Sequence, residues 1–284
     1  MKADSLKKIR LGLIGDNIAA SRAPDLHHAA ARLCDIDVVY ERLVPRDLGL
    51  SFDKVVARAK ADGLRGLNIT HPYKEQILKF ATIEDPALEA IGACNTILFG
   101  ERTTGLNTDY TGYIAAFRAR FGGMSPGVVA MAGSGGAGKA IAFALAKLGA
   151  KSLRIFDNDA QKSHALAKAL QKGHPAISVH VVPTLQQACL NADGLINSTP
   201  LGMVGYGGNA FDGIPLEGRK WICDAVYTPL ETTFLKESKK TGVDILSGYE
   251  LFLYQGVHAF DLFTGRTVDA AALRQALEMS APNS

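Results

Sequence analysis

The sequence predicts an α/β protein of two domains, the second of which is a doubly wound parallel sheet. Three observations support this class. Short β-prone runs alternate with segments whose apolar residues recur at helical spacing. A glycine cluster follows one of these runs and opens a helix. The length of 284 residues exceeds the usual size of a single hydrophobic core, which favours two domains.

The first region alternates strands with helices and ends in a hairpin. Strands are expected at 9–15 and 38–45, a third strand with its loop at 63–72, and helices at 24–33, 52–61, 74–80 and 86–91. A turn-rich stretch at 94–108 has the pattern of a hairpin. These elements predict a first α/β domain over residues 1–107.

The second region has a cleaner rhythm and predicts a mostly parallel sheet with helices on both faces. Strands are expected at 128–133, 152–157, 178–182, 194–199, 220–227 and 243–248, with helices at 140–149 and 160–170. This second domain covers residues 108–248. Helical spacing returns at 250–265 and 268–279, and residues 249–284 are expected to return to the first domain and complete it.

Composition excludes several classes of function. The net charge of +3 comes from interspersed Lys and Arg without a basic run, so no nucleic-acid partner is expected. No stretch approaches the ~20 apolar residues of a membrane span. The N-terminal stretch has a basic start but no cleavage site, which predicts a cytoplasmic protein, and we expect a monomer or a homodimer.

The cysteines and histidines predict no metal site. Cys34, Cys94, Cys189 and Cys223 lie far apart without a CxxC pair, so buried thiols are expected. The spacing of His27, His28 and His71 does not fit a metal-ligand set either. We expect packing or solvent-facing roles for these three histidines.

The glycine cluster at 133–138 predicts a dinucleotide site. Gly133, Gly135 and Gly138 match GxGxxG directly after a predicted strand. Glycine permits the tight turn, the close approach of backbone N–H groups to a pyrophosphate, and tight packing of the helix on its strand. The expected cofactor-binding segment is Gly133, Ser134, Gly135, Gly136, Ala137 and Gly138. A glycine-rich turn without a ligand is the simpler alternative, which the strand and helix on either side disfavour.

Asp157 indicates which dinucleotide binds. It ends the next strand, close to where an acidic residue bonds the ribose hydroxyls in NAD-binding Rossmann domains. Its carboxylate would repel a 2′-phosphate, and the following loop has no arginine to bind one. NAD is therefore the predicted cofactor, and Lys162 leaves NADP open. The alternative is that Asp157 only caps the next helix.

Further segments resemble the shikimate/quinate dehydrogenase family. The matching segments are NITHPYK (68–74), GACNT (92–96), GLNTDYTG (105–112), NSTPLGM (197–203), DAVYTPLETTFL (224–235) and GYELFLYQG (248–256). Their order and spacing match over essentially the whole chain. The resemblance implies an NAD(P)-dependent oxidoreductase of the shikimate pathway of aromatic amino acid biosynthesis, acting on a cyclic hydroxy acid.

The resemblance implies a catalytic dyad of Lys74 and Asp109, which face the reacting hydroxyl in the family. Oxidation of a secondary alcohol needs a group that takes the hydroxyl proton, and reduction needs a donor. The alternative for an arbitrary Lys and Asp is a surface ion pair. Sequence does not decide how the proton is shared between the two side chains.

The same resemblance implies two sets of binding residues. The substrate set is Ser21, Thr70, Asn95, Thr108 and Gln255, with Asn107 beside it. Amides suit ring hydroxyls because they donate and accept without adding charge. The set along the nicotinamide is Thr199, Pro200, Met203, Val226, Tyr227 and Gly248. Taken singly, each polar residue also fits a turn or cap role.

The chain departs from the family where the substrate carboxylate is bound. The family segment SxSP supplies two serine hydroxyls, but this chain has Ser21, Arg22, Ala23 and Pro24. Losing one hydrogen bond to a charged group costs about 1.5 to 3 kcal/mol. Arg22 lies between two inward-facing positions and is expected at the surface. Other departures are Leu106, Tyr110 and Glu250.

These departures keep two alternatives to a shikimate or quinate dehydrogenase open. One is a sensor that binds dinucleotide or a cyclic acid without turnover. The other is a related enzyme specific for an amino- or otherwise substituted shikimate-like acid. An intact Lys74 and Asp109 and a complete glycine motif argue against the sensor.

Overall fold

The computed structural model describes residues 8–279, which divide into two compact units. The described part of unit 1 is residues 8–108 with 253–279, and unit 2 is residues 109–252. The predicted domain limits were 107/108 and 248/249. The predicted ends at residues 1 and 284, and the N-terminal stretch 1–7 used to predict the cytoplasmic location, lie outside the described residues.

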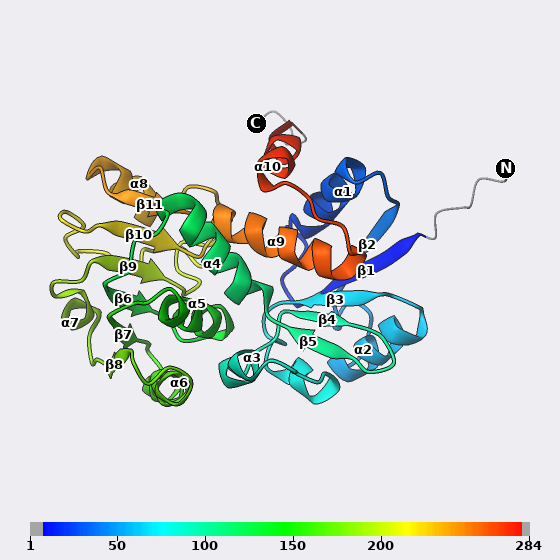
Figure 1. Cartoon of the computed structure of the whole chain (residues 1–284), viewed down its shortest axis with the longest axis horizontal. Coiled ribbons are helices and arrows are strands. Elements are labelled where there is room, and N and C mark those ends of the chain that lie inside the picture. Colours follow the sequence, from blue (N-terminus) through cyan, green and yellow to red (C-terminus); the bar gives the residue numbers. More distant parts are fainter. Residues whose placement is uncertain (1–7, 280–284) are drawn as a thin grey trace. The chain divides into compact units, whose positions relative to one another are not determined.

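Unit 1 contains a five-stranded sheet in the order β2-β1-β3-β4-β5 (Figure 1). Its parallel strands are β1 (Ile9–Ile14), β2 (Val38–Leu43) and β3 (Gly66–Ile69). The predicted hairpin is present as β4 (Thr96–Leu98) and β5 (Thr104–Leu106), which pair antiparallel. The helices are α1 (Ala23–Leu33), α2 (Phe52–Ala61), α3 (Pro86–Ile91) and α10 (Ala270–Met279).

One predicted helix of unit 1 differs in type. Residues 74–80 were expected to be helical, but only Gln76–Phe80 form a turn of helix, η1, and it is a 3₁₀ helix. It has no side-chain cap, and within it only Ile77 is buried. A segment this short with one anchoring side chain does not sustain an α-helix. Lys74 therefore lies in the loop before η1.

Unit 2 contains a six-stranded parallel sheet in the order β11-β10-β9-β6-β7-β8 (Figure 1). Its strands are β6 (Val128–Ala132), β7 (Ser152–Phe156), β8 (Ser178–Val181), β9 (Gly194–Asn197), β10 (Trp221–Asp224) and β11 (Asp244–Leu246). The chain winds outward from β6 in one direction and resumes at β9 in the other. This is the doubly wound Rossmann order, whose ligands bind at the reversal point.

The helices of unit 2 include one that the sequence analysis missed. Those expected as helices or connections are α5 (Gly136–Lys147), α6 (Ala160–Gly173), α7 (Leu185–Cys189) and α8 (Thr233–Lys240). The missed helix is α4 (Thr108–Phe121). Its apolar residues do have helical spacing, at Tyr110, Tyr113, Ile114, Phe117 and Phe121. The aromatic ring of Phe117 meets that of Trp221 in β10 edge to face, 5.2 Å between centroids.

Helix α9 (Gly248–Thr264) begins in unit 2 and continues into unit 1, since the division of the chain falls after Phe252. Within unit 1, the α9 carbonyl of Phe263 accepts from Arg65 Nε at 2.5 Å, and α10 packs on α1. The predicted return of the C-terminal helical region to the first domain is therefore present.

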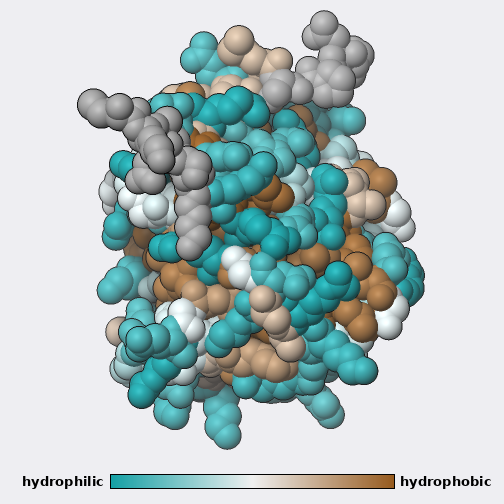
Figure 2. Space-filling view, turned by 90° about the vertical axis from the view of Figure 1, so that its right-hand side faces the viewer, coloured by the Kyte–Doolittle hydropathy of each residue, from teal (hydrophilic) through white to brown (hydrophobic). Residues whose placement is uncertain are grey.

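Each unit has its own apolar core. In unit 1 the core joins α2 to the sheet and includes Phe52, Val55, Leu67, Ile77 and Ile97. In unit 2 it includes Leu185, Leu195, Phe211, Ile222 and Phe234. Polar side chains, drawn in teal, cover most of the face in Figure 2, with brown apolar areas among them. Within residues 8–279 no helix has the length and apolar character of a membrane span.

The cysteines correct one expectation. None of the four forms a disulfide, and Cys94, Cys189 and Cys223 are buried as expected. Cys34 is only half-buried, because it follows the last turn of α1 at the edge of unit 1.

Candidate active site

The predicted substrate residues of unit 1 lie along one edge of its sheet. Strands β1 and β3 end at this edge, β4 begins there and β5 ends there. Thr70 N–H donates to Ile14 O at 3.0 Å, and Ile69 N–H donates to Asn95 O at 2.7 Å. A Cβ on Gly15 would lie 2.3 Å from Thr70 Cγ2, so glycine is required beside that threonine. Thr70 and Asn95 therefore leave the sheet side by side.

Asn95, Thr108 and Gln255 form one hydrogen-bonded cluster. Asn95 Oδ1 accepts from Thr108 N–H at 2.6 Å, and Asn95 Nδ2 donates to Thr108 Oγ1 at 3.0 Å. Thr108 Oγ1 reaches Gln255 Oε1 of α9 at 3.5 Å. Asn95 and Thr108 are almost fully buried. The structure thus brings together three of the five predicted substrate residues.

A second layer behind this cluster was not predicted from sequence. The Thr96 hydroxyl donates to Asn95 Oδ1 at 3.1 Å and accepts from Asn68 Nδ2 at 3.1 Å. Asn68 Oδ1 in turn accepts from the Tyr40 hydroxyl at 2.7 Å. Asn68 and Thr96 belong to the NITHPYK and GACNT segments. The sequence feature that could have identified them is a polar residue at a buried strand position.

His27 packs against this layer. Its ring stacks on Tyr40 with 4.4 Å between centroids and lies near Phe260 and Phe263. Burial lowers the pKa of His27 to about 3, although a hydrogen bond with Asn68 opposes the shift. The predicted packing role of His27 is therefore confirmed, and the whole layer from Tyr40 to Thr108 carries no charge at neutral pH.

The loop that carries Lys74 is held by its neighbours. Tyr73 stacks on Phe52 at 4.4 Å, and its hydroxyl donates to Asp16 at 2.6 Å. The carbonyl of Lys74 accepts from Cys94 N–H at 2.8 Å, which keeps Lys74 next to the Asn95 segment. The Lys74 side chain is half-buried. His71 is exposed, and its carbonyl accepts from Asp16 N–H.

The segment expected to bind a carboxylate opens α1. Ser21 Oγ accepts from Ala23 N–H at 3.3 Å, and its carbonyl accepts from Arg42 at 2.7 Å. Arg22 Nη2 donates to Leu277 O of α10 at 3.3 Å, and Arg22 lies 3.9 Å from Asp25. The guanidinium of Arg22 is thus engaged with α10 and Asp25, and its side chain is half-buried, at 27% exposed, although a surface position was expected.

Asp109 follows Thr108 as the acidic residue in the first turn of α4, and it is 8% exposed. It belongs to unit 2, whereas Lys74 belongs to unit 1. Nearby Asn107 donates to Ala93 O at 2.8 Å, so part of its amide supports the backbone. Tyr110 is buried, and Leu106 and Glu250 are half-buried.

The glycine cluster of unit 2 has the conformation that a dinucleotide site needs. Gly133 has φ +95°, and a Cβ there would lie 2.9 Å from the Ser198 backbone. A Cβ on Gly138 would lie 2.6 Å from Gly133 O, so the helix packs tightly on the turn. Gly135 instead faces open space and caps α5 without a side chain. The N–H groups of the first turn of α5 are therefore available to an anion.

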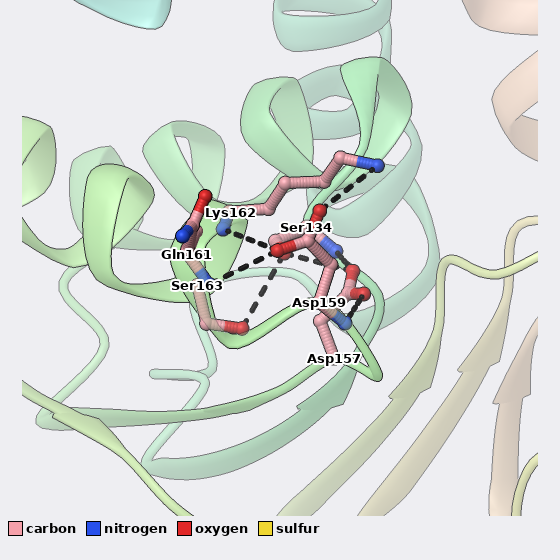
Figure 3. Close-up of polar contacts among 6 residues, drawn as sticks. All are labelled: Ser134, Asp157, Asp159, Gln161, Lys162 and Ser163. Carbon is pink, nitrogen blue, oxygen red and sulfur yellow. Dashed lines mark hydrogen bonds and ion pairs between the residues drawn. The ribbon is translucent and has the colours of Figure 1, made fainter.

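Asp157 follows β7 and is tied to the glycine cluster (Figure 3). Its Oδ2 accepts from Ser134 N–H at 2.7 Å and from the Ser134 hydroxyl at 2.8 Å, and its Oδ1 accepts from Asp159 N–H at 2.9 Å. Partial burial would raise the pKa of Asp157, but these hydrogen bonds and nearby Lys162 outweigh it, so the pKa is lowered. Asp159, and not Asp157, caps α6.

The predicted nicotinamide residues lie in the loops that follow β9 and β10 and at the first residue of α9, which follows β11. Ser198 Oγ donates to Ala132 O and Gly133 O at 2.7 and 2.9 Å, which joins the first loop to the glycine cluster. Val204 N–H donates to Thr228 O at 3.1 Å and joins the first loop to the second. A Cβ on Gly248 would lie 2.3 Å from Val226 O. The rings of Tyr227 and Phe252 stack at 4.8 Å.

A buried acid beneath these loops was also missed from sequence. Asp224 is fully buried and accepts from Thr232 Oγ1, Asn197 Nδ2 and Val226 N–H at 2.5, 2.9 and 3.0 Å. Asn197 Oδ1 also accepts from Thr199 N–H at 3.0 Å. Burial raises the pKa of Asp224 against the effect of these donors. The sequence feature that could have identified this pair is the polar residue at the end of each of two apolar strands, β9 and β10.

The described residues of both units contain no candidate metal site. Among residues 8–279 no cluster of three or more His, Cys, Asp or Glu has a metal-binding arrangement. The described edge of unit 1 carries neutral hydrogen-bonding groups and a lysine, and unit 2 carries a glycine turn with the Asp157 carboxylate hydrogen-bonded beside it.

Comparison with known proteins agrees with this arrangement. The model of the shikimate dehydrogenase substrate binding domain matches residues 13–97, and that of the shikimate 5′-dehydrogenase C-terminal domain matches residues 248–278. A protein of Corynebacterium efficiens named quinate/shikimate dehydrogenase (NAD(+)) is 36% identical over 94% of this chain and 96% of its own. A Pseudarthrobacter chlorophenolicus shikimate dehydrogenase (NADP(+)) is 34% identical over 93% and 92%.

A solved structure gives the same result at the level of the fold. Quinate dehydrogenase from Corynebacterium glutamicum, in complex with NAD, has a TM-score of 0.87 and 33% identity, with 96% of this chain and 99% of that chain covered. The similarity therefore extends over both units. The chain belongs to the shikimate dehydrogenase family.

Proposed function

We propose that this enzyme is an NAD-preferring dehydrogenase that acts on a ring hydroxyl of quinate, shikimate or a close relative. One observation carries the proposal: the ionised Asp157 is held beside a glycine turn that opens an uncapped helix. Relatives named for NAD and for NADP both cover almost the whole chain, so family membership alone does not choose the cofactor.

The residues of unit 2 fit a nicotinamide dinucleotide. The open space at Gly135 and the first-turn N–H groups of α5 suit the pyrophosphate. Asp157 Oδ1 has room to accept from a ribose hydroxyl, and its charge opposes a 2′-phosphate. The Thr199, Val226 and Gly248 loops would line the nicotinamide. When bound, the oxidised cofactor supplies a hydride acceptor.

Lys74 and Asp109 would manage the proton. As the alcohol loses hydride, Lys74 or Asp109 takes the hydroxyl proton, and in the reverse direction the same pair returns it to the carbonyl oxygen. Lys74 is suited to this because its loop is fixed by Tyr73 and Cys94. The two residues belong to different units, so the dyad is a proposal that rests on the family motifs.

Asn95, Thr108 and Gln255 would bind the ring hydroxyls, with Thr70 beside them. The observed cluster leaves these groups uncharged and able to donate as well as accept. Ser21 would donate to the substrate carboxylate. Ala23 supplies no second hydroxyl, and Arg22 is engaged with α10 and Asp25, so we propose weaker carboxylate binding than SxSP provides.

Two alternatives to this function, a sensor and an enzyme for a substituted acid, give different results in the assay below. Similarity over both units to named dehydrogenases does not favour a sensor. A substituted or amino-bearing shikimate-like acid stays a second substrate candidate, because Ala23, Leu106 and Tyr110 change the segments expected around the ring.

The test is an absorbance assay of NAD and NADP reduction with shikimate, quinate and an amino-substituted analogue. We expect turnover with NAD on shikimate or quinate, and a higher kcat/KM with NAD than with NADP. Turnover confined to the analogue would move the substrate to the second candidate. Retained NADH binding without turnover on any acid would contradict a dehydrogenase.

We also propose a cytoplasmic location and a monomeric or homodimeric state. None of the four cysteines forms a disulfide, which is consistent with a reducing compartment. Light scattering on the purified protein tests the oligomeric state, and a tetramer or larger assembly would contradict it.

A further inference from the structure

Ser134 stands inside the glycine cluster, where its side chain is 0% exposed. Its hydroxyl and its backbone N–H both donate to the same oxygen of Asp157, Oδ2, at 2.8 and 2.7 Å (Figure 3). A dinucleotide turn needs glycine for close approach, and no part of that task requires a hydroxyl at position 134. The Ser134 side chain therefore does something other than cradle the pyrophosphate.

The two donors decide which carboxylate oxygen remains open. Each carboxylate oxygen accepts about two hydrogen bonds, so Ser134 occupies Oδ2. Oδ1 has one donor, the Asp159 N–H at 2.9 Å, and Asp157 is half-buried. One acceptor direction thus stays open at Oδ1. A ribose hydroxyl can use that direction, because it carries a proton to donate, whereas a 2′-phosphate presents oxygen to oxygen.

A carboxylate at this position can admit a 2′-phosphate in two ways, by rotating away or by taking up a proton. Rotation would strip the buried Ser134 hydroxyl of its acceptor, and its other hydrogen-bond contact within residues 8–279, Ser163 Oγ, is 3.4 Å away. Protonation is opposed as well, since the hydrogen bonds lower the pKa of Asp157 against the effect of burial.

We propose that Ser134 is a cofactor-selectivity residue whose buried hydroxyl fixes Asp157 in the orientation that accepts a ribose hydroxyl and rejects a 2′-phosphate. The inference rests on the proposed function, because it explains how the NAD preference is maintained. Ser134 acts through Asp157 and is a positioning residue.

Lys162 does not replace this role. Its ammonium lies 3.6 Å from Asp159, and both side chains are about half exposed, at 61% and 46%. An exposed pair of this kind contributes little and does not restrain Lys162 from moving toward a phosphate. Asp157 is therefore restrained by the two Ser134 donors and by the Asp159 N–H, whereas Lys162 is not restrained and limits how strong the selectivity can become.

The experiment compares Ser134→Ala with Ser163→Ala, a neighbouring buried serine whose hydroxyl makes no contact with Asp157 in the described residues. The readouts are kcat/KM with NAD and with NADP, the KM of the cyclic acid, and the dissociation constants of NADH and NADPH from fluorescence. Ser134→Ala should lower the NAD to NADP ratio about tenfold, since one charged hydrogen bond is lost while the backbone N–H remains. The KM of the cyclic acid and the ratio in Ser163→Ala should stay unchanged.

A double-mutant cycle tests whether the hydroxyl acts through the carboxylate. Asp157→Asn should lower the selectivity ratio by itself, and adding Ser134→Ala to it should change the ratio no further. An equal loss with both cofactors in Ser134→Ala, or an undiminished effect in the Asp157→Asn background, would overturn the inference.

The binding constants separate this inference from the proposed reaction. If no cyclic acid is turned over but NADH still binds better than NADPH and Ser134→Ala narrows the gap, the reaction fails and the role of Ser134 stands. If turnover occurs while wild-type protein binds both cofactors equally, the dehydrogenase stands and the role of Ser134 falls.

Discussion

The two units support their site edges with buried polar networks of different charge. In unit 1 the layer from Tyr40 through Asn68, Thr96 and Asn95 to Thr108 consists of hydroxyls and amides. In unit 2 the corresponding supports are carboxylates, Asp224 beneath the loops that follow β9 and β10, and Asp157 beside the glycine turn.

The difference follows from what each edge has to hold. A fixed carboxylate behind Asn95 would repel an acid substrate, while amides and hydroxyls can donate to it and accept from its ring hydroxyls. The loops of unit 2 present backbone N–H groups at tight turns, and a carboxylate satisfies several of these at once. The supports behind Asn95 are therefore neutral, whereas Asp157 and Asp224 hold the loops of unit 2. The charged groups at the unit 1 edge, Lys74 and Asp16, lie outside this neutral layer.

The largest effect on activity should come from replacing Lys74. Lys74→Ala is expected to lower kcat/KM about 1,000-fold, or about 4 kcal/mol, because the proton-transfer group is lost. NADH binding should persist, since the glycine cluster lies in unit 2. Lys79→Ala is the matched control, because Lys79 is exposed and pairs with Asp53 at 2.7 Å. Full activity in Lys74→Ala would remove Lys74 from the mechanism.

Removing the central acid of unit 2 should reduce its stability. Asp224→Ala leaves Thr232 Oγ1, Asn197 Nδ2 and Val226 N–H without their acceptor, so the free energy of unfolding should fall by about 3 kcal/mol. Urea unfolding followed by the fluorescence of Trp221, the single tryptophan, reports on the same strand. Exposed Asp212→Ala is the control. Equal midpoints for the two variants would show that the network contributes nothing.

The neutral network of unit 1 should make its stability depend on pH. The pKa of His27 is about 3 when folded, against 6.5 for an ordinary histidine, so below about pH 6.5 the unfolded chain binds a proton that the folded chain does not. The free energy of unfolding therefore decreases as the pH is lowered through this window, by about 2 kcal/mol between pH 7 and pH 5.

His27→Phe keeps the ring against Tyr40 and removes the titration. Denaturant unfolding followed by circular dichroism should show a smaller loss on acidification in this variant than in wild type. His164→Phe, at an exposed position of α6, should retain the wild-type slope. An unchanged slope in His27→Phe would mean that the buried ring is not the sensor of pH.

The smallest effect should come from restoring the serine hydroxyl that this chain lacks at Ala23. Ala23→Ser places a donor at the first residue of α1 and should raise kcat/KM for shikimate or quinate by up to about tenfold, the gain from one hydrogen bond to a charged group. The methyl ester of the same acid should show no gain, because its carboxylate charge is gone. A gain of equal size with the ester would assign the effect to helix capping at α1.

Periodicity along the chain predicted most strands and helices, because each element buries one face. It failed at 108–121, where β-prone aromatic residues of α4 follow a true hairpin and its helical spacing was not recognised. It also extended a helix over 74–80, where one buried anchor, Ile77, supports only a 3₁₀ turn.

The candidate site was predictable only in part. The motifs located the loops, and the order of the strands then explains why those loops share an edge. The supporting pairs Asn68 with Thr96 and Asn197 with Asp224 join residues 28 and 27 positions apart. Spacing along a single chain contains no information on which buried polar groups meet across neighbouring strands.

For protein engineering, the loop that follows β7 and contains Asp157 and Asp159 is a poor segment to exchange by itself. Asp159 caps α6 through Gln161 and Lys162 while its N–H supports Asp157, and Asp157 is joined to Ser134 23 positions earlier. A transplanted loop that alters cofactor choice would also remove the start of a helix and strand a buried hydroxyl. A graft that carries residue 134 together with 157–162 keeps these contacts within one exchanged module.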